Sequence, residues 1–323
     1  MQKRILGQNL SVSAIGYGAM GLSHAYGTAV EKNEAIKIIR TAFEQGYTLF
    51  DTAALYVGQY ADGATAINEA FVGEAIKPFR DQIVLATKGG AEFHDSKLVI
   101  DGSPEGLRKS VENSLRQLDV ETIDLYYQHM PDPNVAPEVV ADLMGQLIKE
   151  GKIKHWGISN ASVDYIERAD DVTKVTAVQD RFSMLARRKS ERLFPVLKKR
   201  QIGFVAYSPL ASGFLTNQDR SKIDQHNKLD FRGNMHQFTE VGTDEAQAIS
   251  SLVTQLADEK QASPAQISLA WVLKQQPWIV PIPGTSKEKR LIENADAVNI
   301  QLSDDEIKQM NRLLDKVNYD QFD

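Results

Sequence analysis

The chain has no cysteine, no long basic segment and no long apolar run. Without cysteine it forms no disulfide, thiol nucleophile, iron–sulfur cluster or thiolate zinc site. No apolar run approaches the ~20 residues that a membrane span requires. The N-terminal MQKRILGQNL also lacks the apolar core and cleavage site of a secretory signal. The sequence therefore predicts a cytoplasmic protein with no membrane partner.

Charge and histidine spacing exclude two further classes of protein. A formal net charge of −6 argues against a nucleic-acid partner. The one basic stretch, ARRKSER at 186–192, is typical of the solvated start of a helix. The six histidines show no H-x-H spacing at predicted strand ends, so we expect no metal.

Short apolar runs alternate with amphipathic helical patterns along the chain, and no Pro/Gly/Ser-rich linker divides it. A doubly wound open sheet shares this local pattern, but eight apolar runs favour an α/β fold of the (β/α)8 barrel type, a single domain over residues 1–323. The predicted strands are 13–19, 47–52, 82–88, 122–129, 153–159, 175–179, 202–208 and 278–284. The predicted helices are 31–46, 67–77, 103–118, 136–151, 162–170, 190–200 and 303–317.

Two segments depart from this rhythm. Residues 3–6 and 10–13 predict a hairpin that plugs one end of the barrel. The polar segment 215–242 after the seventh strand is longer than an ordinary loop, and loops of that length in a compact domain are usually functional or disordered. A functional loop here would fold over a ligand as a lid.

The stretch GYGAMG, residues 16–21, matches the G-x-G-x-x-G pattern of dinucleotide-binding Rossmann domains. That fingerprint requires a helix to open at the third glycine and an acidic residue about 20 positions later. Here helical periodicity begins near Glu31, and the first strand-end acid is Asp51. We therefore assign these glycines to the first barrel strand and its exit loop, where missing side chains permit close backbone approach.

Reactive side chains end the predicted strands, where (β/α)8 barrels assemble their active sites. Asp51 ends strand two on the face it shares with Tyr47 and Leu49. Lys88 ends strand three and His129 ends strand four.

Asp51 and Lys88 are each costly to bury alone and tolerable as a pair. A lysine beside Tyr56 is expected to lower the tyrosine pKa and make it a usable acid, while His129 would bind a carbonyl or relay its proton. Taken singly, these residues also fit a structural ion pair, a rim tyrosine and a core histidine.

The order GYTLFDTAALY, VLATKGG, IDLYYQH and GISNAS closely resembles the aldo-keto reductase superfamily, NAD(P)H-dependent carbonyl reductases on a (β/α)8 barrel. The resemblance runs from about Lys3 to the final helix. It places the family's catalytic tetrad on Asp51, Tyr56, Lys88 and His129, with Tyr56 as general acid and His129 orienting the carbonyl.

The same resemblance implies a cofactor site. It places Met20 at the barrel mouth, Ser159, Asn160 and Gln179 on the nicotinamide carboxamide, and Tyr207 stacked on the nicotinamide ring. The implied pyrophosphate contacts are Ser208, Pro209, Leu210, Ser212 and Gly213. The implied contacts to the adenosine 2′-phosphate and adenine are Gly284, Thr285, Ser286, Arg290, Glu293 and Asn294.

Arg290 suits a phosphate dianion, so NADPH is favoured over NADH. Gly284 stands where many family members have lysine, which leaves NADH possible. Within the superfamily, GYGAMGLSHAYG, YYQHMPDPN and LDFRGNMHQF are most similar to bacterial and plant general aldehyde and pyridoxal reductases. That branch implies a lid contact from Arg232 to the cofactor phosphates.

The implied activity is reduction of a small-molecule carbonyl, without a metal. The alternative is a non-catalytic NADPH-binding regulatory subunit, because potassium-channel β-subunits resemble the same family. Those subunits carry an added N-terminal segment, whereas the predicted hairpin begins at about residue 3, so the sequence favours an enzyme. His24, Tyr26, Phe93 and Met130 are candidates for the substrate side. Both a monomer and a homo-oligomer stay open.

Overall fold

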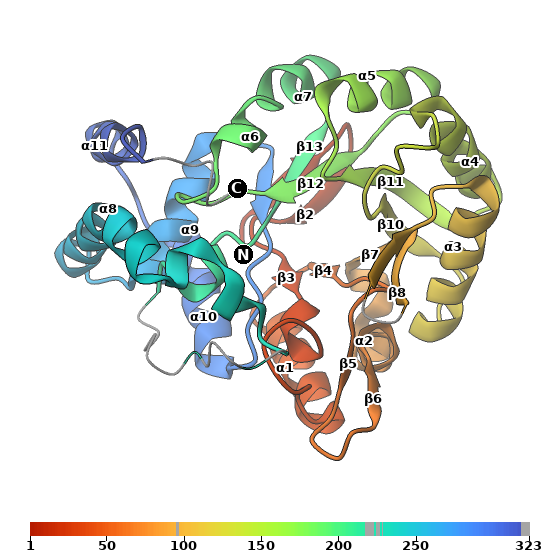
Figure 1. Cartoon of the computed structure of the whole chain (residues 1–323), viewed down its shortest axis with the longest axis horizontal. Coiled ribbons are helices and arrows are strands. Elements are labelled where there is room, and N and C mark those ends of the chain that lie inside the picture. Colours follow the sequence, from red (N-terminus) through yellow and green to blue (C-terminus); the bar gives the residue numbers. More distant parts are fainter. Residues whose placement is uncertain (95–96, 217–222, 224–226, 228, 318–323) are drawn as a thin grey trace.

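A computed structural model describes residues 1–94, 97–216, 223, 227 and 229–317. Its centre is an eight-stranded parallel sheet in the order β14-β13-β12-β11-β10-β7-β4-β3, with helices around the outside (Figure 1). Each predicted strand is present, most of them shorter than predicted. Their bounds are β3 Tyr17–Gly18, β4 Leu49–Asp51, β7 Val84–Gly89, β10 Ile123–Gln128, β11 Ile153–Ser159, β12 Ala177–Arg181, β13 Gly203–Tyr207 and β14 Ile279–Pro281.

Hydrogen bonds between the first and last strands close the sheet into a barrel. Gly16 N donates to Pro281 O at 2.9 Å, and Gly18 N donates to Pro283 O at 3.4 Å. A Cβ atom at Gly18 would lie 2.7 Å from Ile282 O, and one at Gly284 would lie 2.6 Å from Gly18 O. Gly18 of GYGAMG thus permits barrel closure. Because the first α-helix, α1 (Lys32–Glu44), begins only at Lys32, no α-helix opens at Gly21 as a Rossmann fingerprint requires.

Gly18→Ala is expected to destabilise the protein by about 1–3 kcal/mol, because the added methyl group meets a hydrogen-bonded backbone rather than a movable side chain. Urea denaturation of parent and variant measures the difference in the free energy of unfolding. Equal midpoints and slopes would contradict the close-approach role of this glycine.

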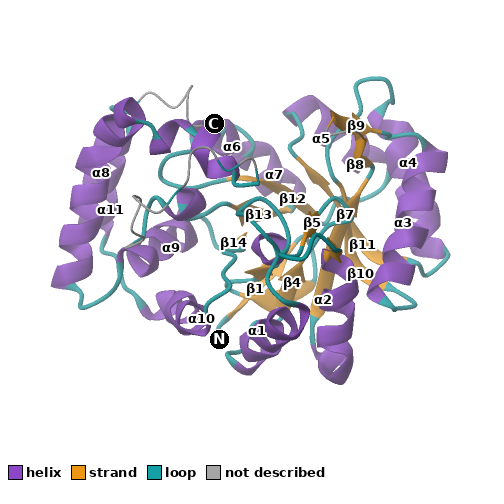
Figure 2. Cartoon of the chain, turned by 60° about the horizontal axis from the view of Figure 1, so that its bottom comes forward, coloured by secondary structure: helices purple, strands orange, loops and turns teal. Residues whose placement is uncertain are grey.

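Helices α1 to α5 pack on one another in chain order around the barrel, whereas α8 packs on α9 and α11 at one side of it (Figure 2). Proline or serine begins several of them; Ser103, for example, accepts a hydrogen bond from Gly106 N, with Pro104 in the first turn of α3. Among the described residues no helix is long and apolar enough to cross a bilayer. Their bounds are α1 Lys32–Glu44, α2 Asn68–Ile76, α3 Pro104–Leu118, α4 Pro137–Lys149, α5 Val163–Val172, α6 Arg188–Glu191, α7 Phe194–Arg200, α8 Glu240–Glu259, α9 Pro264–Gln275, α10 Glu288–Asp296 and α11 Asp304–Leu314.

Two apolar layers hold the barrel together. The larger lies between strands and helices, and the smaller fills the barrel with side chains such as Leu49, Leu125 and Val205. The predicted hairpin is confirmed as β1 (Lys3–Leu6) and β2 (Leu10–Ser13), and its Leu6 and Val12 pack into the inner layer. The hairpin therefore plugs the barrel.

The structure corrects four local predictions. The helix expected over 190–200 is divided into α6 and α7, with Pro195 in the first turn of α7. The stretch 186–192 is not fully solvated, because Arg187 is buried and pairs with Glu191 and Asp315. Tyr47 precedes β4 and lies in the outer layer, where its hydroxyl donates to Leu291 O. The expected loop 215–242 ends early because α8 begins at Glu240.

Two hairpins that the sequence did not predict follow strands of the barrel. β5 (Val57–Gln59) pairs with β6 (Thr65–Ile67), and β8 (Ala91–His94) pairs with β9 (Lys97–Ile100). Both are antiparallel. They follow β4 and β7, so they extend the loops at the end of the barrel where the strands terminate.

Candidate active site

The ends of three neighbouring strands bring the predicted tetrad together. Asp51 is the last residue of β4, Lys88 lies near the end of β7, and His129 directly follows β10. Tyr56 lies in the loop between β4 and β5. Asp51 and Lys88 are 3% and 1% exposed, while Tyr56 and His129 are 9% exposed. The tetrad thus pairs a fully buried ion pair with two side chains at the edge of solvent.

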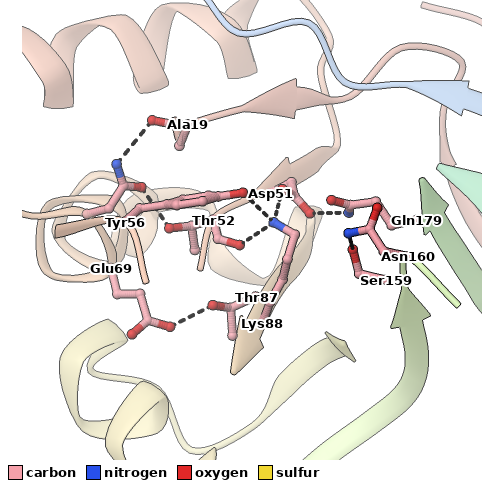
Figure 3. A network of polar contacts seen from close by, with 11 residues as sticks. Ala19, Asp51, Thr52, Tyr56, Glu69, Thr87, Lys88, Ser159, Asn160 and Gln179 are labelled. Carbon is pink, nitrogen blue, oxygen red and sulfur yellow. Dashed lines mark hydrogen bonds and ion pairs between the residues drawn. The ribbon is translucent and has the colours of Figure 1, made fainter. Parts of the chain in front are cut away.

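Lys88 contacts both Asp51 and Tyr56 (Figure 3). Its Nζ donates to Asp51 Oδ1 at 2.5 Å, to Thr52 O at 2.8 Å and to the Tyr56 hydroxyl oxygen at 3.1 Å. All three ammonium protons are therefore used. Burial acts to lower the pKa of Lys88, but the charges and hydrogen bonds of Asp51 and Tyr56 outweigh it and raise this pKa. Lys88 is a cation at neutral pH.

The expectation of a lowered Tyr56 pKa is wrong. Burial raises the pKa of Tyr56, and the Lys88 ammonium opposes the shift without overcoming it. Tyr56 therefore carries its proton at neutral pH. The 3.1 Å contact with Lys88 also means that an ammonium lies beside any tyrosinate formed when that proton leaves.

His129 is neutral at physiological pH. Burial is the main cause that lowers its pKa to about 3, and the charge of Lys88 adds to it. Its ring meets the Tyr56 ring edge-on, with 6.1 Å between centroids. Its buried Nδ1 has no hydrogen-bond partner within the described residues. A neutral imidazole next to the acid is suited to hydrogen-bonding a ligand oxygen.

The titration of His129 makes stability depend on pH. The pKa is depressed in the folded state, so between about 3 and the ordinary value of 6.5 the unfolded chain binds the extra proton. The stabilising contribution is full above that range and is lost as the pH falls through it. We expect the free energy of unfolding of the parent to fall more steeply than that of His129→Gln, by at most about 1.4 kcal/mol per pH unit. Urea denaturation between neutral pH and pH 4 measures both slopes, and equal slopes would rule out this titration.

A second polar group adjoins the tetrad at the ends of β11, β12 and β13. Tyr207 OH donates to Asn160 Oδ1 at 3.0 Å, and Asn160 Nδ2 donates to Ser159 Oγ at 3.0 Å. Gln179 Nε2 donates to Asp51 Oδ2 at 2.8 Å, which joins this group to the tetrad. The structure thus brings together the four residues that resemblance assigns to the nicotinamide.

Arg181 was missed by the sequence reasoning. Its guanidinium carbon lies 6.0 Å from the centre of the Tyr207 ring. The sequence could have indicated it. Residues two apart on a strand share a face, and Arg181 lies two positions after Gln179 on β12.

The loop after β13 has an unusual backbone. Ser208, Ala211 and Ser212 have φ values of 49°, 49° and 55°, and Gly213 has 95°. Left-handed conformations of non-glycine residues cost about 1–3 kcal/mol each and cluster at ligand clamps. This loop also contains Pro209 and Leu210, so all five predicted pyrophosphate contacts lie within the strained segment.

The predicted phosphate and adenine contacts lie in one segment that runs from β14 into α10. Gly284, Thr285 and Ser286 precede α10, and Thr285 O accepts a hydrogen bond from Tyr17 OH at 2.8 Å. Arg290 is exposed in the first turns of α10, whereas Asn294 is 3% exposed. Glu293 lies between them along the helix.

The described part of the expected lid contacts the loop after strand one. Phe231 N donates to Ala25 O, and Gly27 N donates to Leu229 O. Arg232 is held by Asp230, with an Nη2–Oδ2 distance of 2.5 Å, and lies over the Tyr26 ring. Residues 217–222, 224–226 and 228 of the expected lid lie outside the described residues.

Aromatic rings from three loops gather next to Tyr56. His24 stacks on the Tyr56 ring with 5.9 Å between centroids, and Phe93 lies 6.1 Å from His24. Phe231, which the sequence reasoning missed, meets His24 edge-on at 5.4 Å. Met20, the predicted cofactor contact at the barrel mouth, begins the short 3-10 helix η1 (Met20–Leu22). The described residues hold no group of three or more His, Cys, Asp or Glu side chains suited to a metal.

Comparison with known proteins gives consistent matches along the chain. The model of the aldo/keto reductase family matches residues 14–315. A probable aldo-keto reductase 1 from Glycine max is 39% identical over 314 residues, covering 94% of this chain and 86% of the relative.

Two solved structures are similar in fold. A glycerol dehydrogenase from Gluconobacter oxydans has a TM-score of 0.85 and 27% identity, and the match covers 97% of this chain and 94% of that chain. An aldo/keto reductase from Klebsiella pneumoniae in complex with NADP and acetate has a TM-score of 0.72 and 25% identity, with 99% of each chain covered.

Proposed function

The chain belongs to the aldo/keto reductase family and is an oxidoreductase, and from this premise we propose that it reduces aldehydes and ketones to alcohols with NADPH and with Tyr56 as general acid. The observation that carries the proposal is the Lys88 Nζ–Tyr56 OH distance of 3.1 Å within a buried tetrad. A protonated tyrosine beside a fixed cation is an acid whose conjugate base is stabilised in place.

In this proposal the proton that the carbonyl oxygen receives comes from a side chain of the protein. The O–H bond of Tyr56 breaks, and its proton passes to the carbonyl oxygen of the substrate. The charge left on the phenolate oxygen lies next to the Lys88 ammonium, which Asp51 and Thr52 O hold in position. Neutral His129 donates a hydrogen bond that orients the carbonyl. NADPH, when bound, supplies the hydride to the carbonyl carbon.

The residues around the tetrad fit a nicotinamide dinucleotide. Asn160, Ser159 and Gln179 present amide and hydroxyl groups to a carboxamide, and Tyr207 presents an aromatic face. The strained loop 208–213 supports a pyrophosphate contact, since such strain is characteristic of ligand clamps. The start of α10, with its free N–H groups, supports a phosphate contact there. Arg232 at the lid would meet phosphates only by exchanging its pairing with Asp230.

An assay of NADPH consumption with a panel of carbonyls tests the function. Pyridoxal, methylglyoxal, nitrobenzaldehyde and open-chain sugars cover small, aromatic and polar substrates. We expect turnover of at least one aldehyde, with the same rate after chelator treatment. Absence of turnover across the panel, or inhibition by chelator that zinc reverses, would refute the proposed reaction.

The preference for NADPH is tested at Arg290. We expect Arg290→Ala to raise the KM for NADPH roughly 10–100-fold, because a charge-assisted contact to a phosphate is worth about 1.5–3 kcal/mol. The KM for NADH should change less than about twofold, since that cofactor lacks the 2′-phosphate. Lys289→Ala, which removes an exposed cation from the same helix, is the matched control. Equal effects of Arg290→Ala on both cofactors would remove the assignment.

A further inference from the structure

Helix α2 opens on two polar residues that are entirely buried. Asn68 is 0% exposed and Glu69 is 1% exposed. Burying an amide and a carboxyl is costly unless both find hydrogen-bond partners. Their partners are two threonines: Thr52 Oγ1 donates to Asn68 Oδ1 at 2.7 Å, and Thr87 Oγ1 donates to Glu69 Oε1 at 2.6 Å.

Each threonine is the chain neighbour of a tetrad residue. Thr52 directly follows Asp51, and Thr87 directly precedes Lys88 on β7. Successive side chains of a strand point to opposite faces, so Thr87 faces α2 while Lys88 faces the barrel interior. Figure 3 shows the Glu69–Thr87 contact beside Lys88. The first turn of α2 therefore holds the two strand ends that carry the buried ion pair.

Asn68 also reaches the backbone of the proposed acid. Its backbone N–H donates to Tyr56 O at 3.2 Å. Its Nδ2 donates to Ser23 Oγ at 2.6 Å, and Ser23 Oγ donates to Tyr56 O at 3.0 Å. The same Nδ2 contacts Ala19 O at 3.1 Å. One side chain thus joins the Tyr56 loop, the end of strand one and the end of β4.

The network includes an acceptor of Lys88. Thr52 donates its hydroxyl to Asn68, while its carbonyl oxygen accepts from Lys88 Nζ at 2.8 Å. Asn68 is therefore linked to the Lys88 ammonium through Thr52, and it bonds directly to the backbone of Tyr56. Replacing both partners of a buried hydrogen bond by apolar side chains of the same shape changes the free energy of unfolding little. Apolar residues could therefore fill the positions of Thr52 and Asn68 if their role were only structural.

We propose that Asn68 is a positioning residue that sets the Lys88–Tyr56 geometry through Thr52 and Ser23, and that Glu69 supports Lys88 through Thr87. The proposal rests on the proposed function of Tyr56 as the acid. Neither Asn68 nor Glu69 touches the reacting atoms. Their effect is on the distance between ammonium and phenol, and misplacement of reacting groups by about 1 Å can cost a hundredfold in rate.

The sharpest test is Thr52→Val against Thr52→Ser, because valine keeps the shape of threonine and removes only the hydroxyl. We expect Thr52→Val to lower kcat roughly 10–100-fold, with the KM for NADPH within about twofold of the parent. We expect Thr52→Ser to restore most of the rate. Asn311→Ala, which removes the acceptor of Trp271 Nε1 between α9 and α11, is the control for a lost buried hydrogen bond far from the tetrad.

A second measurement does not depend on turnover. The ultraviolet absorbance of tyrosinate, titrated in parent and Tyr56→Phe, isolates the ionisation of Tyr56. The charge of Lys88 acts to lower the Tyr56 pKa, so a displaced ammonium should raise this pKa further in Thr52→Val and Asn68→Ala, but not in Asn311→Ala.

Two results would overturn the positioning role. One is a folded Thr52→Val variant with kcat and Tyr56 ionisation unchanged from the parent. The other is an equal loss of rate in Thr52→Val and Thr52→Ser. Failure of the proposed function is separate, because it shows as absence of turnover by the parent across the carbonyl panel.

Discussion

Tyr56→Phe is expected to lower kcat by about 10²–10⁴-fold while the protein stays folded and binds NADPH. The variant removes the only proposed proton donor to the carbonyl oxygen. The phenyl ring retains the packing of a residue that is 9% exposed, against His24 and His129. Lys88 loses one of its three acceptors but keeps Asp51 and Thr52 O.

The rate is measured as NADPH consumption with the best aldehyde of the panel, and binding is measured as quenching of tryptophan fluorescence. Tyr47→Phe is the matched control, because Tyr47 is also buried and its hydroxyl donates to Leu291 O at 2.8 Å in the outer apolar layer. Turnover of Tyr56→Phe near that of Tyr47→Phe would assign the proton to another group.

Lys88→Met is expected to abolish detectable turnover and to destabilise the fold by about 3–5 kcal/mol, because it removes one partner of a buried ion pair. Burial raises the pKa of Asp51, and Lys88 normally opposes that shift. Without the ammonium, Asp51 takes up a proton, and Tyr56 loses the charge that stabilises its conjugate base.

A double variant separates stability from catalysis. Asp51→Asn in the Lys88→Met background removes the uncompensated carboxyl and still accepts a hydrogen bond from Gln179. We expect the double variant to be more stable than Lys88→Met by about 1–4 kcal/mol, while turnover stays lost. Urea denaturation of the parent, the two single variants and the double variant gives the coupling energy between Asp51 and Lys88. Additive free energies would mean that Asp51 and Lys88 do not act as a pair.

Local sequence patterns predicted which segments form the barrel, and they identified all eight of its strands. Alternation and strand-end position identified Asp51, Lys88 and His129, and the eight-strand count favoured a barrel. Pro195, inside the predicted helical pattern 190–200, was overlooked, so α6 and α7 were joined into one helix. The hairpins β5–β6 and β8–β9 were not predicted, although Asp62-Gly63 between β5 and β6 is a strong turn signal.

The sequence alone could not predict the direction of the pKa shift of Tyr56. The direction of the Tyr56 shift depends on whether burial or Lys88 dominates, and that comparison requires the depth of the hydroxyl as well as the identity of its neighbour. Burial also decides that His129 is neutral. A residue type and a spacing predict which charges meet, but not how much water remains around them.

The sequence by itself determined that this chain is an α/β barrel of the aldo/keto reductase family, since periodicity and the order of its motifs are properties of the chain. Only the tertiary structure decided how its distant parts meet: Gly18 against Ile282, Gln179 on Asp51, and α2 against the ends of β4 and β7. These contacts join residues from separate strands and helices. Their geometry follows from barrel closure, which no local pattern specifies.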